Sequence, residues 1–189
     1  MNPFASEYYR VPRKKRHLLL PEKPAGTIKP VFASQDRRLV PELKSGTTTT
    51  GKPHIVLVED CVEDVQLLEA ALESAPFEVR LTRLANGREA LFYLTSPIFD
   101  TDRDNHPLPD ILLLDLGLPG GVSGLEVLKT VRSKPTLDGL IVYALTSSHD
   151  DWDVYRANEL LVDAYLTKPT TFAGLVELVR DIRSGWLKA

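Results

Sequence analysis

Cysteine is nearly absent from this sequence, and long apolar runs are absent altogether. The 189 residues include a single cysteine, Cys61, which excludes an internal disulfide and is typical of a protein in a reducing compartment. No apolar run approaches the roughly 18 residues that a membrane span requires. The three leucines at residues 18–20 are too few for the core of a signal peptide. These absences predict a cytoplasmic protein without a membrane span.

Charge is distributed unevenly along the chain. Residues 1–52 carry 11 Lys/Arg and 4 Asp/Glu, a net charge of +7, whereas residues 53–189 carry 12 and 22, a net charge of −10. Prolines recur through residues 1–53 and apolar periodicity is missing there, so this part cannot bury enough surface to offset its chain entropy. We therefore expect a disordered, basic, Pro-rich tail over residues 1–53 and one folded domain over residues 54–189.

The basic run Arg-Lys-Lys-Arg at residues 13–16 is the one feature of this tail that suggests a binding function. Such a run can bind nucleic acid, an anionic membrane surface or an acidic protein. A solvated charge run with no partner is the more ordinary interpretation. Nothing else in the sequence has a helix-turn-helix or another DNA-reading pattern, so nucleic-acid binding is not expected outside the tail.

From His54 onward, short apolar runs alternate with amphipathic stretches. The runs at 55–58, 78–84, 111–114, 140–145 and 164–167 predict strands, and four large apolar residues in a row at 111–114 are typical of a strand buried on both faces. Apolar residues at helical spacing follow each run, around 65–72, 90–94, 125–131, 154–161 and 172–182. Strict alternation predicts an α/β fold with a doubly wound, five-stranded parallel sheet and helices on both faces.

Some local features of these elements can also be predicted. Ser123 is expected to cap the helix that follows it, and Asp150 or Asp151 the next one. In the first helix, Asp64 is expected on the solvent side together with other acids. Residues 96–108 are polar and form a loop longer than most connections in α/β units.

Polar side chains follow four of the five predicted strands: Glu59, Asp60, Asp115, Thr146 and Lys168. Because the carboxyl ends of parallel strands meet at one edge of a sheet, all five are expected to face one crevice. Each has an ordinary alternative: the acids cap helices or turns, the threonine lies in a solvated loop, and the lysine lies on the surface. Those alternatives would have to hold together at four strand ends, so we favour a functional site.

The residue types indicate which chemistry this site performs. Clustered carboxylates resist ionisation unless a cation neutralises them, and oxygen ligands with room for water and phosphate suit Mg²⁺. A lysine and a threonine hydroxyl complement a transferred phosphoryl group. The set therefore suggests attack by a carboxylate on phosphorus to give an aspartyl phosphate, with Asp115, which has no neighbouring acid, as the nucleophile.

Four segments together resemble the receiver domain of bacterial response regulators, a flavodoxin-like fold. They are Ile-Val-Leu-Val-Glu-Asp at 55–60, Leu-Leu-Leu-Asp-Leu-Gly-Leu-Pro at 112–119, Ala-Leu-Thr-Ser-Ser at 144–148 and Tyr-Leu-Thr-Lys-Pro at 165–169. The long loop at 96–108 and the Leu-Thr-Lys-Pro ending resemble the single-domain subfamily that partners bacterial phytochromes. The resemblance covers residues 54–189 and leaves the tail unexplained.

The resemblance implies a role for each site residue. Asp115 would be the phosphoacceptor and a metal ligand, Asp60 a direct ligand of Mg²⁺, and Glu59 a ligand through water. The backbone carbonyl of Gly117 would complete the metal site, and the phosphoryl oxygens would be bound by Thr146 and Lys168. Tyr165 would be the aromatic residue that switches with Thr146, and the bond from Lys168 to Pro169 is one where this family uses a cis peptide.

Three departures from the family pattern matter. The turn at 120–124 (Gly-Gly-Val-Ser-Gly) has one residue more than the usual spacing from the acceptor. Gly117 and Ser148 are small where they flank the site, which predicts an atypical lifetime of the phosphorylated form. Cys61 adjoins the acid pair; a redox role is conceivable, but a small buried residue at the helix start is the preferred interpretation.

The implied function is that of a two-component phosphorelay response regulator. Its phosphodonor would be a sensor histidine kinase or a phosphotransfer protein, and phosphorylation would switch a protein-binding surface, expected on the last two helices and the strand between them. A downstream protein of unknown identity, or a second copy in a homodimer, would bind there. The only chemistry expected is its own phosphorylation and dephosphorylation, so we expect no enzyme acting on a separate substrate.

Two other classes stay open. A degenerate receiver would serve as a phosphorylation-independent binding module, although the complete set of acids, threonine and lysine argues against it. A phosphohydrolase with an aspartate nucleophile would need a second aspartate two residues after the first, where this chain has Gly117.

Overall fold

The computed structural model describes residues 52–100, 102, 104–146, 157 and 159–187. The predicted tail, apart from its last two residues, therefore lies outside the described residues. Ser148 and the predicted helix start at Asp150 or Asp151 also lie outside them.

Five parallel strands form one sheet in the order β2-β1-β3-β4-β5. They are β1 (His54–Val58), β2 (Arg80–Leu84), β3 (Ile111–Asp115), β4 (Ile141–Thr146) and β5 (Ala164–Thr167). The helices are α1 (Val62–Glu73), α2 (Gly87–Thr95), α3 (Pro97–Asp100), α4 (Gly124–Ser133) and α6 (Phe172–Leu187), with a 3₁₀ turn η1 (Pro135–Leu137). The predicted doubly wound parallel sheet is confirmed.

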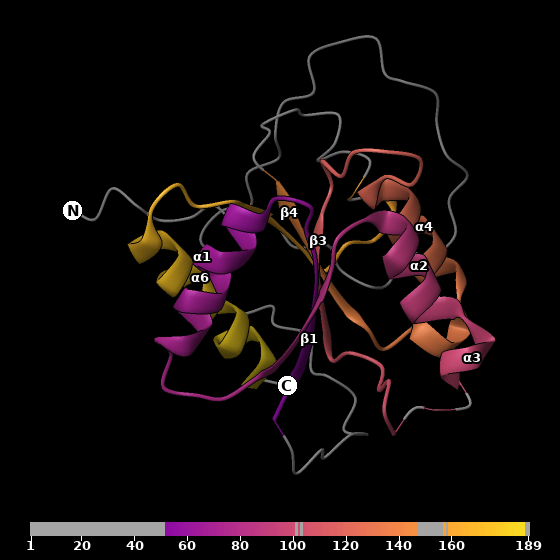
Figure 1. Ribbon diagram of the computed structural model, residues 1–189, viewed down its shortest axis with the longest axis horizontal. Coiled ribbons are helices and arrows are strands. Elements are labelled where there is room, and N and C mark those ends of the chain that lie inside the picture. Colours follow the sequence, from indigo (N-terminus) through magenta and orange to yellow (C-terminus); the bar gives the residue numbers. More distant parts are fainter. Residues whose placement is uncertain (1–51, 101, 103, 147–156, 158, 188–189) are drawn as a thin grey trace, which may run out of the picture.

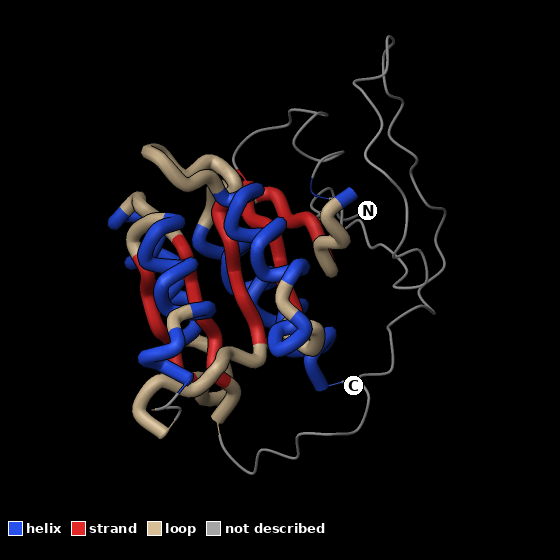
Figure 2. The backbone as a smooth tube through the Cα atoms, turned by 90° about the vertical axis from the view of Figure 1, so that its right-hand side faces the viewer, coloured by secondary structure: helices blue, strands red, loops and turns tan. Residues whose placement is uncertain are grey.

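Helices cover both faces of the sheet. In Figure 1, α1 and α6 lie on one side of the strands and α2, α3 and α4 on the other; Figure 2 turns the second side toward the viewer, with the strands running side by side behind it. Because successive strand residues point to opposite faces, each inner strand contributes side chains to two hydrophobic cores, one on each face of the sheet. Leu112 and Leu114 pack in the core under α2 and α4, and Ile111 and Leu113 in the core under α1 and α6.

Two glycines allow the loop after β3 to lie close to its neighbours. A Cβ on Gly124, the first residue of α4, would overlap the carbonyl oxygen of Asp115, and one on Gly87, the first residue of α2, would overlap the carbonyl oxygen of Val122. The predicted cap of α4 is present as a capping box: Ser123 Oγ accepts from the Glu126 N–H, and the Glu126 carboxylate accepts from the Ser123 N–H at 2.8 Å. These contacts fix where α4 starts relative to Asp115.

Several local predictions were wrong. β2 begins at Arg80 rather than Glu78, because pairing with β1 starts where Arg80 faces His54. The long loop contains a helical turn, α3, which starts at Pro97, a residue whose fixed φ suits the first position of a helix. Cys61 is half-buried rather than buried.

The sequence permits either isomer of the Lys168–Pro169 peptide bond, and in the structure this bond is trans.

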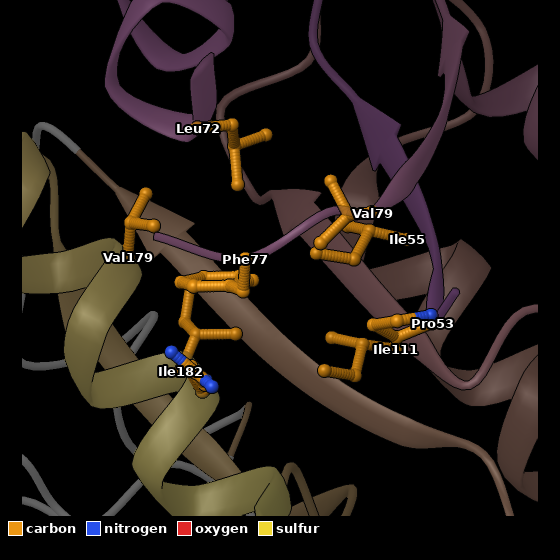
Figure 3. A pocket seen from close by; sticks show the side chains of 9 residues that line it. Pro53, Ile55, Leu72, Phe77, Val79, Ile111, Val179 and Ile182 are labelled. Atoms are coloured by element: carbon orange, nitrogen blue, oxygen red, sulfur yellow. The ribbon is translucent and has the colours of Figure 1, made fainter. Parts of the chain in front are cut away.

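A small apolar recess lies between α1, α6 and the starts of β1 and β3 (Figure 3). Leu72, Phe77 and Val179 line it, and the guanidinium of Arg183 lies over the Phe77 ring at 4.7 Å from its centroid. The recess is at the amino edge of the sheet, away from the strand ends that carry the predicted site. No helix among the described residues is long and apolar enough to cross a membrane.

Candidate functional site

The fold brings the five predicted side chains to the carboxyl edge of the sheet. Backbone hydrogen bonds extend past the strand ends: Glu59 donates its N–H to the Leu84 carbonyl at 3.0 Å, and Lys168 donates its N–H to the Thr146 carbonyl at 2.8 Å. The residue after each apolar strand is therefore still held in register with its neighbour. This is why the polar groups converge rather than diverge into loops.

Lys168 is the centre of the cluster. Its Nζ lies 2.7 Å from Glu59 Oε2, 2.8 Å from Asp115 Oδ2 and 2.9 Å from an oxygen of Asp64. Burial by itself lowers the pKa of Lys168, but the hydrogen bonds that its ammonium group donates to the carboxylates of Asp115, Glu59 and Asp64 outweigh this effect and hold the pKa above its ordinary value. The ammonium group is therefore charged throughout the physiological range.

Glu59 and Asp115 are almost fully buried, at 2% and 6% exposure, whereas Asp60 is exposed. Desolvation raises the pKa of Glu59, and Lys168 offsets this only in part. One oxygen from each of the three carboxylates lies within 4.8 Å of the other two. A compact, oxygen-only set with excess negative charge fits a hard divalent cation such as Mg²⁺ or Mn²⁺.

The two oxygens of Asp115 have different partners. Oδ1 accepts the Gly117 N–H at 2.7 Å, and Oδ2 is paired with Lys168. A side chain at position 117 would start 3.3 Å from Asp115 Oδ1, so glycine leaves this oxygen more open than any larger residue. The role of the Gly117 carbonyl as a metal ligand stays a prediction.

Thr146 ends β4 and is buried beside the cluster, and Tyr165 is buried in the core under α2 and α4, where it pairs with Ala144 in the ladder from β4 to β5. The two residues therefore lie on adjacent strands, close to the same edge. Their coupled movement stays a prediction.

Cys61 supports the acid pair through its backbone. Its N–H donates to Glu59 Oε1 at 3.2 Å, while its thiol lies 3.3 Å from Glu63 Oε2. The side chain makes no capping hydrogen bond to α1. Nothing in these contacts favours a redox role.

Asp64 is the site residue that the sequence prediction missed. It was expected on the solvent side of α1, but its carboxylate faces Lys168. The available signal was its position, since Asp64 lies in the first turn of the helix that starts directly after the acid pair at 59–60.

Comparisons with known proteins agree with this geometry. The family model of the response regulator receiver domain matches residues 55–180. Response regulator Rcp1 of Synechocystis sp. is 36% identical over 134 residues, which is 71% of this chain and 88% of Rcp1.

Two solved structures are similar in fold. The phosphorylated cyanobacterial phytochrome response regulator RcpA has a TM-score of 0.64 and 33% identity, covering 72% of this chain and 95% of RcpA. The Mn²⁺-bound form of Rcp1 has a TM-score of 0.62 and 36% identity, covering 71% of this chain and 94% of that one. With the matched family model, the parallel sheet and the acid–lysine cluster at its carboxyl edge, the chain belongs to the family of response regulator receiver domains of two-component signalling.

Proposed function

We propose that this receiver domain accepts a phosphoryl group on Asp115, with Mg²⁺, from a sensor histidine kinase or a phosphotransfer protein. The observation that carries the proposal is the pairing of buried Asp115 with Lys168 beside the carboxylates of Glu59 and Asp60. The similarity to RcpA, solved in a phosphorylated form, and to Rcp1, solved with Mn²⁺, supports both parts of it. A kinase of the phytochrome type is one class of donor that the similarity to RcpA favours.

In the proposed reaction, Asp115 Oδ2 attacks phosphorus and forms an O–P bond. The bond from phosphorus to the donor's imidazole nitrogen breaks, and that nitrogen keeps the electron pair. Gly117 holds the other carboxylate oxygen and so fixes the plane of the nucleophile. Lys168 and the Thr146 hydroxyl then bind phosphoryl oxygens.

Four groups would hold the metal: the carboxylates of Asp60 and Asp115 directly, Glu59 through water, and the carbonyl of Gly117. The bound cation supplies positive charge that neutralises the carboxylates and the phosphoryl oxygens. Because burial raises the pKa of Glu59, the desolvated carboxylate gains from any nearby cation.

The output is proposed to be a change of surface rather than a reaction on another molecule. Thr146 would move toward the phosphoryl group and Tyr165 would turn into the space left behind. This would alter the predicted face of β5 and the helices on either side of it, of which the structure describes α6. A downstream protein or a second copy of the chain would bind that face. Hydrolysis of the O–P bond by water resets the site, so the proposed chemistry is confined to the domain itself, acting in the cytoplasm.

Intact-mass analysis tests the proposal. The protein is incubated with acetyl phosphate and Mg²⁺, beside a chelated sample and Asp115→Asn. We expect a gain of one phosphoryl group that disappears with chelator and in the variant. No gain with acetyl phosphate or with a phosphorylated histidine phosphotransfer protein would instead support a phosphorylation-independent binding module.

A further inference from the structure

Lys168 has one more carboxylate partner than the proposed reaction uses. Asp64, in the first turn of α1, places an oxygen 2.9 Å from the ammonium group. Lys168 is already paired with Glu59 and Asp115, and Asp60 lies beside them. Three carboxylates therefore contact a single ammonium group, and a fourth, that of Asp60, lies beside two of them.

A first-turn acid has an ordinary role, which is to interact favourably with the positive end of the helix dipole. That role is shared by Glu63, the neighbouring acid of the same turn, whose carboxylate approaches the Cys61 thiol and forms no ion pair with Lys168. The difference between the two acids is thus contact with Lys168. Asp64 is 41% exposed in its side chain, against 16% for Lys168, so its carboxylate can turn away without leaving a buried charge behind.

We propose that Asp64 is a positioning residue that holds Lys168 in the unphosphorylated domain and competes with the incoming phosphoryl group for it. The inference rests on the proposed phosphorylation of Asp115. A phosphoryl group on Asp115 would bind the Lys168 ammonium, whose charge Asp64 partly neutralises. The Asp64 carboxylate would also repel the negatively charged phosphoryl group. Asp64 therefore sets how readily the domain takes up a phosphoryl group, and it restrains uptake.

The size of the effect follows from the distances. Asp64 and Asp115 contact the same ammonium group, so their carboxylates are separated by only a few ångströms. Removing one unit charge at such a distance, in the high effective dielectric of a partly exposed site, is expected to raise the rate of phosphoryl transfer about threefold to tenfold.

The test compares rate constants for phosphorylation by acetyl phosphate at saturating Mg²⁺, followed by intact mass over time. Asp64→Asn removes the negative charge that is paired with Lys168, and Glu63→Gln makes the same charge change one residue away. Asp64→Glu keeps the negative charge at position 64. Metal titrations set the saturating concentration for each variant, and thermal unfolding checks that each is folded.

We expect Asp64→Asn to react about threefold to tenfold faster than the native domain and Glu63→Gln within about twofold of it. Asp64→Glu should return to the native rate. The advantage of Asp64→Asn should shrink in 1 M salt, where the screening length is about 3 Å; a purely structural effect would not respond in this way.

A slower Asp64→Asn, or one that behaves like Glu63→Gln, would overturn the inference while leaving the proposed function intact. If the native domain takes up no phosphoryl group under any condition, the proposed function fails and the inference fails with it.

Discussion

Both edges of the parallel sheet bury ionisable side chains, but they balance the charges differently. At the amino edge, Arg132 pairs with Asp163 at 2.6 Å and donates hydrogen bonds to the carbonyls of Leu140 and Leu161. At the carboxyl edge, one ammonium group faces three carboxylates. The Arg132–Asp163 pair is balanced in charge, whereas the cluster around Lys168 is not.

The amino edge also contains a buried neutral group. His54 donates its backbone N–H to Asp110 at 2.8 Å, and its ring Nε2 lies 2.9 Å from Thr82 Oγ1. Burial lowers the pKa of His54 below its ordinary value of 6.5, which favours the neutral ring. At the amino edge, the ion pair is therefore balanced in charge. The cluster at the carboxyl edge keeps an excess of negative charge that a bound cation would neutralise. We therefore expect the charged groups of the amino edge to contribute stability, and those of the carboxyl edge to bind a cation and a phosphoryl group.

The largest effect is expected from removing Lys168, the cation that three carboxylates of the carboxyl edge share. Lys168→Met should lower the free energy of unfolding in chelated buffer by about 3 kcal/mol, because Glu59 and Asp115 stay buried without a counter-ion. Mg²⁺ should restore part of that loss, and Lys168→Arg should lose less. Urea unfolding with and without Mg²⁺ measures this; equal stability of Lys168→Met and the native protein in chelator would contradict the charge imbalance.

At the amino edge, Asp163→Ala should cost stability without affecting phosphoryl uptake. We expect a loss of about 2 kcal/mol, because Arg132 and the Val142 N–H lose their shared acceptor in a mostly buried place. Glu78→Ala is the matched control: its pair with Lys52 is exposed, and its loss should cost less than about 0.5 kcal/mol. Urea unfolding measures the loss of stability, and intact mass measures phosphoryl uptake. Reduced uptake by a folded Asp163→Ala variant would contradict the proposal that the two edges have separate roles.

Glu59→Gln should improve stability and weaken metal binding at once. The pKa of Glu59 is raised in the folded protein, so ionising this buried carboxyl costs stability as the pH rises through that pKa. Glutamine stays neutral at every pH, so the variant does not incur this cost. The metal-free variant is expected to be more stable than the native protein at pH 7.5. Its Mg²⁺ affinity should fall about 10-fold to 100-fold, as for a ligand acting through water. Calorimetric titration with Mg²⁺ tests this, and an unchanged affinity would exclude Glu59 from the metal site.

The smallest effect concerns pH at the amino edge. The pKa of His54 is lowered on folding, so below pH 6.5, its ordinary value, the unfolded chain binds a proton that the folded protein does not. Stability should therefore fall as pH drops below 6.5, by at most about 1.4 kcal/mol per pH unit. His54→Gln should flatten this part of the pH profile of urea unfolding; an unchanged slope would assign the dependence to other groups.

The order of strands and helices and the convergence of Glu59, Asp115 and Lys168 could be predicted, because buried parallel strands leave a clear apolar signal and end at a common edge. Asp64 could not be assigned in the same way. Its place in α1 fits a solvent-facing acid as well as a partner of Lys168, and only the packing of Val65 and Leu68 on the sheet decides between them. The isomer of the Lys168–Pro169 bond was also beyond prediction, since cis and trans differ by only about 0.5–1 kcal/mol before tertiary contacts act.

We propose that the carboxylates and the lysine of the carboxyl edge serve to place a phosphoryl group on Asp115. Borohydride reduction after treatment with acetyl phosphate and Mg²⁺ tests it most directly, because it converts an aspartyl phosphate to homoserine and marks the residue that carried it. We expect peptide mass spectrometry to find homoserine at position 115, and to find none in chelated samples. Homoserine at Asp60 or Asp64 instead, or a phosphoryl group that resists reduction, would contradict it.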